Sequence, residues 1–455
     1  MAVISQGKRA GGKLPRGPHR LSDEEVAADQ RRRLVDAMIK LAGGKGYAAT
    51  TVANIIARAQ VSRKTFYEHF ADRKDLLLAA FDTASPAALE KIRLAAQRAD
   101  GPTRQVEALM RRLTELARES PGTIALSAIE IAAVEPEGVQ RRERLMDAFG
   151  QLIDKCLGGV DGERKALPPT LALALAGGTY RTLDAQLRLG RGAEPTAVAA
   201  QLARWTRSYH PVPSYLMAEQ EQVPSPWHRL GGDGLLGGRA PGTLTLAPDG
   251  YEAPREVRSK GFVHHANRER ILDAVARLTA QHGYTELTAV GIAERADISE
   301  RAFLAHFKNK DDAFVAAVEV GHVKAQALVE RARSGAPNWR TGVRNSVGAL
   351  LEFLASEPYF TRLAFVDAPL AGPKMAKRMH EQAGAYARLM LDGAPQRRRP
   401  PAIAPEATVQ SIFELAFYQA TKDQVPKLSS LSREITYLAL APYLGVTDAA
   451  ELAAS

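Results

Sequence analysis

Residues 62–70 bring side chains that could bind a polyanion onto one short segment. The segment reads SRKTFYEHF, and Phe66 and Phe70 lie four residues apart, so on a helix they share one face and should pack inward. The remaining faces then carry cationic and hydrogen-bonding groups, which come from Arg63, Lys64, Thr65, Tyr67 and His69. Guanidinium and ammonium groups bind phosphates and base edges, with Arg63 and Lys64 at the end of the helix where bases are read. This chemistry is recognition of nucleic acid.

The elements that must position this face can be read from the residues before it. An amphipathic helix is expected to stop at Gly46, where a left-handed residue is tolerated. A second helix over 51–59 follows, with the hydroxyl of Thr50 or Thr51 as its N-cap. A serine then caps a third helix over 63–70. A short helix with one apolar and one basic face, preceded by a helix and a tight turn, fits the DNA major groove.

The same segment occurs twice in the chain. Placing Leu34 on Ile271 aligns residues 34–82 with residues 271–319 without a gap, and we call this displacement the repeat shift. The identical pairs include Gly46/Gly283, Tyr47/Tyr284, Thr51/Thr288, Ser62/Ser299, Phe66/Phe303, His69/His306 and Phe70/Phe307. The repeat shift continues downstream, where it pairs Pro121 with Pro358, Pro136 with Pro373, Arg141 with Arg378, and Glu130 with Asp367. Each half is therefore expected to be one complete unit of roughly 190 residues.

Positive charge is concentrated near these segments. The chain of 455 residues has a net charge of +10, and residues 1–74 contain 15 Lys and Arg against 7 Asp and Glu. Residues 255–310 contain 10 against 7, whereas the rest of the chain is close to neutral. A polyanionic partner that touches the two segments is the direct interpretation, and a solvated basic surface is the alternative.

Several function classes are excluded by what the sequence lacks. A single cysteine rules out an intrachain disulfide framework and a cysteine-rich zinc site, and no metal site or cofactor is expected. No catalytic motif such as G-x-S-x-G, H-E-x-x-H or a P-loop occurs, so we expect no enzyme. The longest apolar stretch, near 171–176, is far too short to span a bilayer, and no secretory signal is seen. We expect a cytoplasmic protein with no membrane partner.

The predicted fold class is all-α. Apolar residues recur at spacings of three and four in both halves, as in Leu34, Ala37, Met38 and Leu41, whereas alternation typical of strands is rare. Two segments interrupt the helical pattern. Residues 1–20 carry five Lys and Arg and no acid, which is typical of a disordered arm, and residues 211–260 carry seven Pro and seven Gly, the composition of a linker.

The string TTVANIIARAQVSRKTFYEHFADRKDLL resembles the N-terminal domain of the TetR family of bacterial transcriptional regulators, and TAVGIAERADISERAFLAHFKNKDDAF in the second half matches less closely. The resemblance implies two tandem units, each with a helix-turn-helix head and a helical regulatory and dimerisation body. We therefore expect a basic arm at 1–24, a first head at 25–82, a first body at 83–210, a linker at 211–260, a second head at 261–319 and a second body at 320–455.

The resemblance also assigns roles to single residues. It implies that Arg63, Lys64 and Thr65 approach bases, while Thr51, Tyr67 and Arg73 contact the DNA backbone. His69 and His306 are expected at the edge of the core or facing phosphates, because no partner at metal-ligand spacing is near. In the second unit the matching, weaker contacts are expected from Thr288, Arg301, His306 and Lys310.

The second unit departs from the first where DNA would be contacted. Tyr67 corresponds to Leu304, Thr65 to Ala302 and Arg63 to Glu300, whose carboxylate would repel phosphates. The glycine usual in the turn of this family is Gln60 in the first head and Asp297 in the second, and Gln tolerates the left-handed conformation poorly. These differences predict a strong half-site under the first head and a weak one under the second.

Four charged residues outside the heads lie in or beside apolar helical segments. Glu130 and Asp367 interrupt apolar helical runs, so they are candidate effector contacts, although hydrogen-bonded or solvent-facing acids are the more ordinary interpretation. Arg181 and Arg188 flank a helix rich in Ala and Leu and are expected on a solvated face.

The sequence thus favours a sequence-specific transcriptional regulator, most simply a repressor released from a double-stranded DNA operator by an unidentified small-molecule effector. One alternative is a sequence-tolerant DNA-organising protein, and another is a helical binding module or enzyme that does not use DNA. Helices near 169–189, 195–209, 405–424 and 430–444 could join the halves as an intramolecular pseudo-dimer. A higher homo-oligomer is the alternative assembly.

Overall fold

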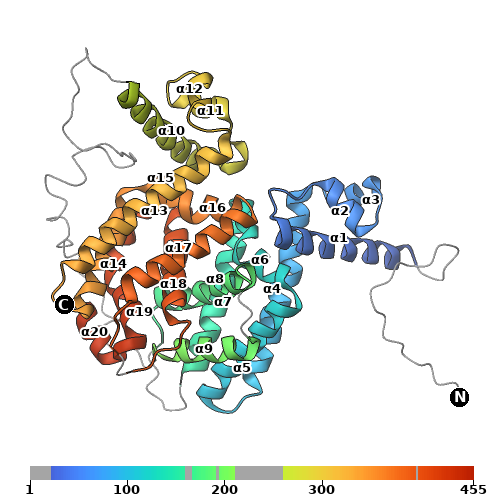
Figure 1. The fold of residues 1–455 in the computed structure, drawn as a ribbon. Coiled ribbons are helices and arrows are strands. Elements are labelled where there is room, and N and C mark those ends of the chain that lie inside the picture. Colours follow the sequence, from blue (N-terminus) through green and yellow to red (C-terminus); the bar gives the residue numbers. More distant parts are fainter. Residues whose placement is uncertain (1–21, 159–165, 191–193, 211–259, 396–397, 455) are drawn as a thin grey trace, which may run out of the picture.

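The computed structural model describes residues 22–158, 166–190, 194–210, 260–395 and 398–454. Within these ranges every regular element is a helix, and no strand occurs (Figure 1). The all-α expectation is confirmed. The predicted basic arm and the predicted linker lie almost entirely outside the described residues.

The first three helices of the first head each have a side-chain cap at their start. Helix α1 (Asp23–Lys45) begins with a capping box between Ser22 and Glu25. Helix α2 (Val52–Ala59) begins at Thr51, whose hydroxyl accepts the Asn54 N–H, and α3 (Arg63–His69) begins at Ser62. Each cap satisfies backbone N–H groups that the first turn of a helix leaves without a partner. Gly46, with φ of +85°, follows α1 as predicted.

The rest of the first half is a stack of helices that begins within the head. Helix α4 (Arg73–Gln97) runs without interruption past residue 82, so it belongs to the head at one end and to the body at the other. The following elements are α5 (Gly101–Glu119), α6 (Pro121–Ala128), the 3₁₀ turn η1 (Glu130–Ala133), α7 (Glu137–Leu157), α8 (Pro169–Arg188) and α9 (Pro195–Arg207).

The second half repeats this order. Its head contains α10 (Lys260–His282), η4 (Tyr284–Glu286), α11 (Ala289–Arg295), α12 (Glu300–Leu304) and the start of α13 (Lys310–Ser334). Its body continues with α14 (Trp339–Ser356), α15 (Pro358–Arg362), the π-helical turn η5 (Leu363–Asp367), α16 (Ala368–Leu370), α17 (Pro373–Leu391), α18 (Ala404–Thr421), η6 (Val425–Leu431), α19 (Ser432–Leu444) and α20 (Val446–Ala454).

Surface ion pairs show that the repeat extends into the bodies. Arg141 on α7 bonds Asp82 on α4, with Nε 2.8 Å from Oδ1. Arg378 on α17 pairs in the same way with Glu319 on α13. The repeat shift carries both partners of the first pair onto those of the second, so α7 corresponds to α17 and α4 to α13.

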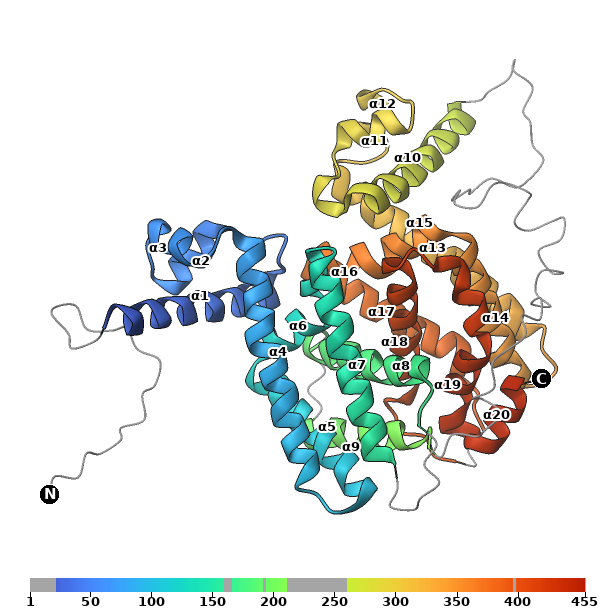
Figure 2. The ribbon, with the colours of Figure 1, turned by 180° about the vertical axis from the view of Figure 1, so that it is seen from behind.

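The two bodies pack directly against each other through α8 and α18, with α9 and α19 beside them. Figures 1 and 2 show both heads on one side of the joined bodies, well apart from each other. Close approach requires glycine, because a Cβ added to Gly177 on α8 would lie 2.1 Å from Cγ of Glu414 on α18. One added to Gly178 would lie 2.0 Å from the Ser411 hydroxyl oxygen. These helices are those that the sequence singles out for joining the halves.

Candidate nucleic-acid interface

Helix α3 buries its two phenylalanines and exposes its basic face. Phe66 and Phe70 are almost fully buried and pack on each other at 6.3 Å between ring centroids, as predicted. The Lys64 side chain is 87% exposed, and its Nζ lies 3.7 Å from Glu68. Tyr67 is 49% exposed, and the Arg63 guanidinium lies 5.9 Å from the centre of its ring. Arg63, Lys64 and Tyr67 therefore form one exposed face, which we call the α3 face.

The other predicted contacts of the first head take part in local structure as well. The Thr65 hydroxyl lies 2.9 Å from that of Ser62, and Thr51 is exposed and caps α2. His69 is half-buried, with Nε2 3.1 Å from the Gln30 amide oxygen on α1. The hydroxyl groups of Thr51 and Thr65 therefore lie near the surface, at the starts of α2 and α3.

Arg73 points into the head and binds the loop before α2. Its Nη1 donates to the Thr50 carbonyl oxygen at 2.9 Å, and its guanidinium lies 4.6 Å from the centre of the Tyr47 ring. Lys310, the equivalent residue, lies 5.2 Å from the centre of the Tyr284 ring. Both cations thus stabilise the same loop in their own head, and their expected contact with the DNA backbone stays a prediction.

The turn between α2 and α3 keeps its geometry without glycine. Gln60 and Asp297 adopt the left-handed conformation, with φ of +54° and +51°. In the first head Arg33 on α1 donates to the carbonyl oxygens of Ala59 at 3.0 Å and Gln60 at 3.3 Å. Sequence reasoning missed this brace.

Arg270 forms the equivalent brace in the second head. It donates to both the carbonyl and a carboxylate oxygen of Asp297, each at 2.8 Å. The signal that could have revealed the braces is the repeat shift itself. It places Arg33 on Arg270, and each arginine immediately precedes the aligned segment of its own half.

The second head presents a different surface at the equivalent positions. Helix α12 has five residues against seven in α3, and Leu304, in the place of Tyr67, is 54% exposed. Thr288 caps α11 and is exposed, as is Arg301, while His306 is half-buried. Residues 51–70 contain three Arg and Lys against one Glu, whereas residues 288–307 contain two Arg against three acids. The charge therefore changes from +2 to −1.

A family model described as "Bacterial regulatory proteins, tetR family" matches residues 34–80 and again residues 271–317. Both heads belong to the TetR family. The two tandem units expected from the sequence are thereby confirmed, and the chain is a DNA-binding transcription regulator. No curated protein matches the sequence.

Solved structures similar to one half of the chain are TetR-type or fatty-acid regulators. The fatty acid degradation regulator FadR from Bacillus halodurans shares 15% identity over 40% of this chain and 96% of its own, with a TM-score of 0.36. FadR from Bacillus subtilis, solved in complex with stearoyl-CoA, shares 16% over 39% and 97%, with a TM-score of 0.35. A TetR-family regulator from Syntrophomonas wolfei shares 14% over 40% and 94%, with a TM-score of 0.33.

Neither a metal cluster nor a membrane span occurs in the described part of the chain. No group of three or more His, Cys, Asp or Glu residues there could hold a metal ion. None of the described helices is long and apolar enough to cross a membrane.

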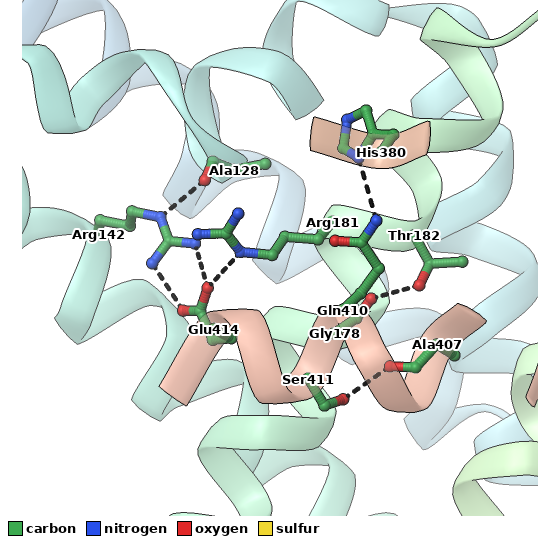
Figure 3. A network of polar contacts seen from close by, with 10 residues as sticks. All are labelled: Ala128, Arg142, Gly178, Arg181, Thr182, His380, Ala407, Gln410, Ser411 and Glu414. Carbon is green, nitrogen blue, oxygen red and sulfur yellow. Dashed lines mark hydrogen bonds and ion pairs between the residues drawn. The ribbon is translucent and has the colours of Figure 1, made fainter. Parts of the chain in front are cut away.

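A buried ion-pair network joins the halves beside Gly177, and we call it the junction network (Figure 3). Glu414 on α18 accepts from Arg142 on α7, at 2.6 and 2.7 Å, and from Nε of Arg181 on α8 at 2.9 Å. Burial raises the pKa of Glu414, but the two guanidinium groups outweigh it and lower that pKa to about 2. The network is therefore ionised at neutral pH.

The expectation of a solvated face for Arg181 and Arg188 is wrong. Arg181 is 4% exposed and lies within the junction network. The Arg188 side chain is 10% exposed and bonds Asp184, with Nε 2.7 Å from Oδ2. The pattern of one helix does not reveal this burial, because Glu414 belongs to α18 and Glu130, the second partner of Arg188, belongs to η1.

Glu130 and Asp367 lie between body and head in their own halves. Glu130 is 2% exposed, and its Oε2 accepts the Tyr47 N–H at 2.8 Å. Asp367 is 4% exposed and lies beside the backbone N–H of Tyr284, which lowers its pKa. Neither carboxylate lines the pockets described next, and their expected contact with an effector stays a prediction.

Two hollows lie between the halves. A pocket of about 370 Å³ is formed by the end of α9, by Arg398 and by the α19–α20 connection. A cavity of about 10 Å³ lies beside Arg181, His380 and Gln410, with Phe365 and Phe413 on its apolar side. The small cavity has room for about one water molecule, whereas the larger pocket falls within the size range of small-ligand sites.

Proposed function

We propose that the chain is a repressor that binds an asymmetric operator through two unequal heads and is released by a small effector. The observation that carries the proposal is the α3 face, where Arg63, Lys64 and Tyr67 are exposed together on the second helix of a helix-turn-helix. Such a helix can enter the major groove with its N-terminal residues at the bases. The site of action would be the bacterial nucleoid.

Within the first head the proposed roles follow position and exposure. Arg63 and Lys64 are at the start of α3 and would bind base edges, with Thr65 beside them. Tyr67 and Thr51 would donate to phosphates. His69 and Arg73 would contribute less, because each already bonds a group of its own head.

The second head is proposed to bind DNA weakly. Arg301, Thr288, His306 and Lys310 would be its contacts, but the acidic balance of residues 288–307 opposes approach to phosphates. Its contribution would then be to extend the protected site rather than to select the sequence.

Effector release is supported by the location of the larger pocket. It is lined by residues of both halves, so a ligand bound there would act on how the bodies pack and hence on the spacing of the heads. A ligand that favours a different packing would weaken binding to a site that needs both heads at fixed spacing.

The test uses the full chain and an operator selected from genomic DNA by binding. Arg63→Ala should weaken binding to this operator by about 1–3 kcal/mol if Arg63 makes a bidentate base contact. Tyr67→Phe should weaken binding to operator and scrambled DNA alike. Fluorescence anisotropy at several salt concentrations measures both.

Arg301→Ala is the matched control, because Arg301 is an exposed arginine at the start of the equivalent helix. It should change operator affinity much less than Arg63→Ala. Equal affinity of the parent chain for operator and scrambled DNA would favour the DNA-organising alternative. Absence of any DNA binding would refute the proposal.

A further inference from the structure

Each half holds its head by a buried carboxylate at the same position of the repeat. Glu130 in η1 accepts the N–H of Tyr47 at 2.8 Å, and Asp367 in η5 lies beside the N–H of Tyr284, which lowers its pKa. The repeat shift maps Glu130 onto Asp367 and Tyr47 onto Tyr284. Two different acids, in two different types of turn, therefore face the equivalent loop of their own head.

The bound peptide group lies at the joint between the helices of the head. Tyr47 is in the loop between α1 and α2, and its ring lies under Arg73 from α4. Arg73 also donates to the Thr50 carbonyl oxygen. A carboxylate that fixes this loop therefore fixes the first, second and fourth helices of the head together.

In the first half the carboxylate is linked to the second half through α8. Nη2 of Arg188 lies 3.5 Å from Oε1 of Glu130, and its Nε lies 2.7 Å from Oδ2 of Asp184. The same oxygen of Asp184 lies 2.9 Å from Nε2 of His380, which belongs to α17 of the second half. Gln410 on α18 contacts the other nitrogen of His380 at 3.1 Å, which orients the ring.

In the second half the link crosses in the opposite direction. Nε of Arg362 lies 3.9 Å from Oδ2 of Asp367. Nη2 of Arg362 donates to both carboxylate oxygens of Glu135, at 2.9 and 3.0 Å. Glu135 lies between η1 and α7, in the first half. Each head thus contacts an acid whose arginine is linked to the other half, directly through Glu135 for Arg362 and through Asp184 for Arg188.

We propose that Glu130 and Asp367 are positioning residues that couple the two heads. A movement of either body would then change the position of the head of the other half. The inference rests on the proposed function, because coupling matters only if both heads meet one operator. It supplies the route by which a change in the packing of the bodies would reach the heads.

The raised pKa values of the two acids are consistent with this role. Burial raises the pKa of Glu130 to about 7, against the opposing effects of the Tyr47 N–H and Arg188, while Asp184 raises it further. Burial likewise raises the pKa of Asp367 to about 8, with Arg362 lowering it and Glu135 raising it. An ionised carboxylate is the stronger acceptor, so protonation near neutral pH loosens the hold on the loop.

Hydrogen exchange of the full chain without DNA tests the hold on each head. Glu130→Ala should speed exchange of the peptide over 46–51 by about tenfold or more, the effect of losing a hydrogen bond to a charged group. Glu130→Gln should restore part of the slow exchange, because its amide oxygen accepts the same N–H but is a weaker acceptor than a carboxylate. Unchanged exchange in Glu130→Ala, or no restoration in Glu130→Gln, would overturn the positioning role.

Coupling between the halves is tested by Glu135→Ala, a change at a partly exposed residue of the first half. It should speed exchange of the peptide over 283–288 in the second head. Glu143→Ala is the matched control, because Glu143 also crosses between the halves, to Tyr418 and Lys422, but belongs to neither link. Equal exchange over 283–288 in both variants would overturn the coupling.

The outcome is independent of whether the proposed operator exists. Because exchange is measured without DNA, the coupling can fail while Arg63→Ala still weakens operator binding, and it can succeed while no operator is found. If both hold, Glu135→Ala should also weaken binding to the selected operator while leaving binding to an isolated half-site unchanged.

Discussion

At the scale of single residues, buried carboxyl groups set how stability depends on pH. Burial raises the pKa of Glu130 to about 7, of Asp367 to about 8 and of Glu357 to about 7. An acid with a raised pKa in the folded state stabilises the fold at low pH, and this contribution is lost as pH rises through that pKa. All three groups therefore act in the same direction.

The free energy of unfolding should consequently fall as pH rises toward the folded pKa values, and the fall should be measurable between pH 6 and pH 8. The folded chain still holds protons there that the unfolded chain has released, and each carboxyl should account for about 1–3 kcal/mol of the fall. Urea unfolding across this range measures it. The double variant Glu130→Gln, Asp367→Asn should show a flatter profile, and an unchanged slope would contradict the assignment.

Residue positions were predictable where the partner lies on the same short segment. Phe66 and Phe70 pack inward because their spacing of four places them on one face of α3. Arg181 was predicted wrongly because its partner, Glu414, lies in the other half of the chain. Charge on an otherwise apolar helix indicates solvent or a buried partner equally well, and only the packing of α8 on α18 decides.

At the scale of elements, α3 and α12, the helices proposed to enter the major groove, differ in length, charge and exposed surface. Helix α3 ends at His69 and carries Arg63 and Lys64, whereas α12 ends at Leu304 and begins with Glu300. A full operator should therefore contain one half-site with strong sequence preference and one with little. The difference arises from the side chains and from the shorter α12, because the caps and the turn are alike in both heads.

Footprinting of the full chain on its selected operator checks this asymmetry. Protection should be strong over the half-site under α3 and weak over the half-site under α12, and mutation of the weak half-site should cost little affinity. Exchanging the charge with Glu300→Arg should strengthen protection of the weak half-site. Two equally protected inverted half-sites in the parent chain would be inconsistent with unequal heads.

The long helices could be placed from sequence to within a few residues, whereas the short turns could not. The periodicity of the apolar residues predicted helices at 169–189 and 195–209, close to α8 and α9. It did not reveal η1, where the helix tightens to a 3₁₀ turn, or η5, where it widens to a π-helical turn. These turns form where a buried acid must reach the head, which is a demand of tertiary packing rather than of local pattern.

At the scale of the whole molecule, the joint between the halves depends on two glycines. A Cβ at Gly177 would lie 2.1 Å from Glu414, so Gly177→Ala should disturb α8 and α18 and destabilise the chain by about 1–3 kcal/mol. Gly384→Ala on α17 is the control, because only the tip of Arg388 lies near, at 3.6 Å. It should be neutral or stabilise by about 0.5–1 kcal/mol.

Thermal unfolding of the two alanine variants provides the measurement. Gly177→Ala should lower the midpoint and Gly384→Ala should leave it unchanged or raise it. A midpoint for Gly177→Ala equal to that of the parent chain would mean that α8 and α18 are further apart than described.

Pairing of the halves within one chain predicts a monomer. The linker keeps the halves at an effective concentration of about millimolar, which favours pairing within the chain over pairing between chains. Light scattering at low micromolar concentration should give 49.2 kDa, with one chain bound per operator. A stable species of twice this mass, bound as two chains to a palindrome, would refute the internal pairing.

The contact between Gly177 and Glu414 bears on how such a protein can evolve. The repeat shift places Gly177 on Glu414, so these two residues are equivalent, and they face each other across the joint. A homodimer presents the same residue on both sides of its axis, so it would bring together either two glutamates or two glycines. Once both copies are encoded as a single chain, a mutation changes the residue on only one side of the joint between the halves. A fused pair can therefore carry two different heads, here one with a basic balance over residues 51–70 and one with an acidic balance over residues 288–307.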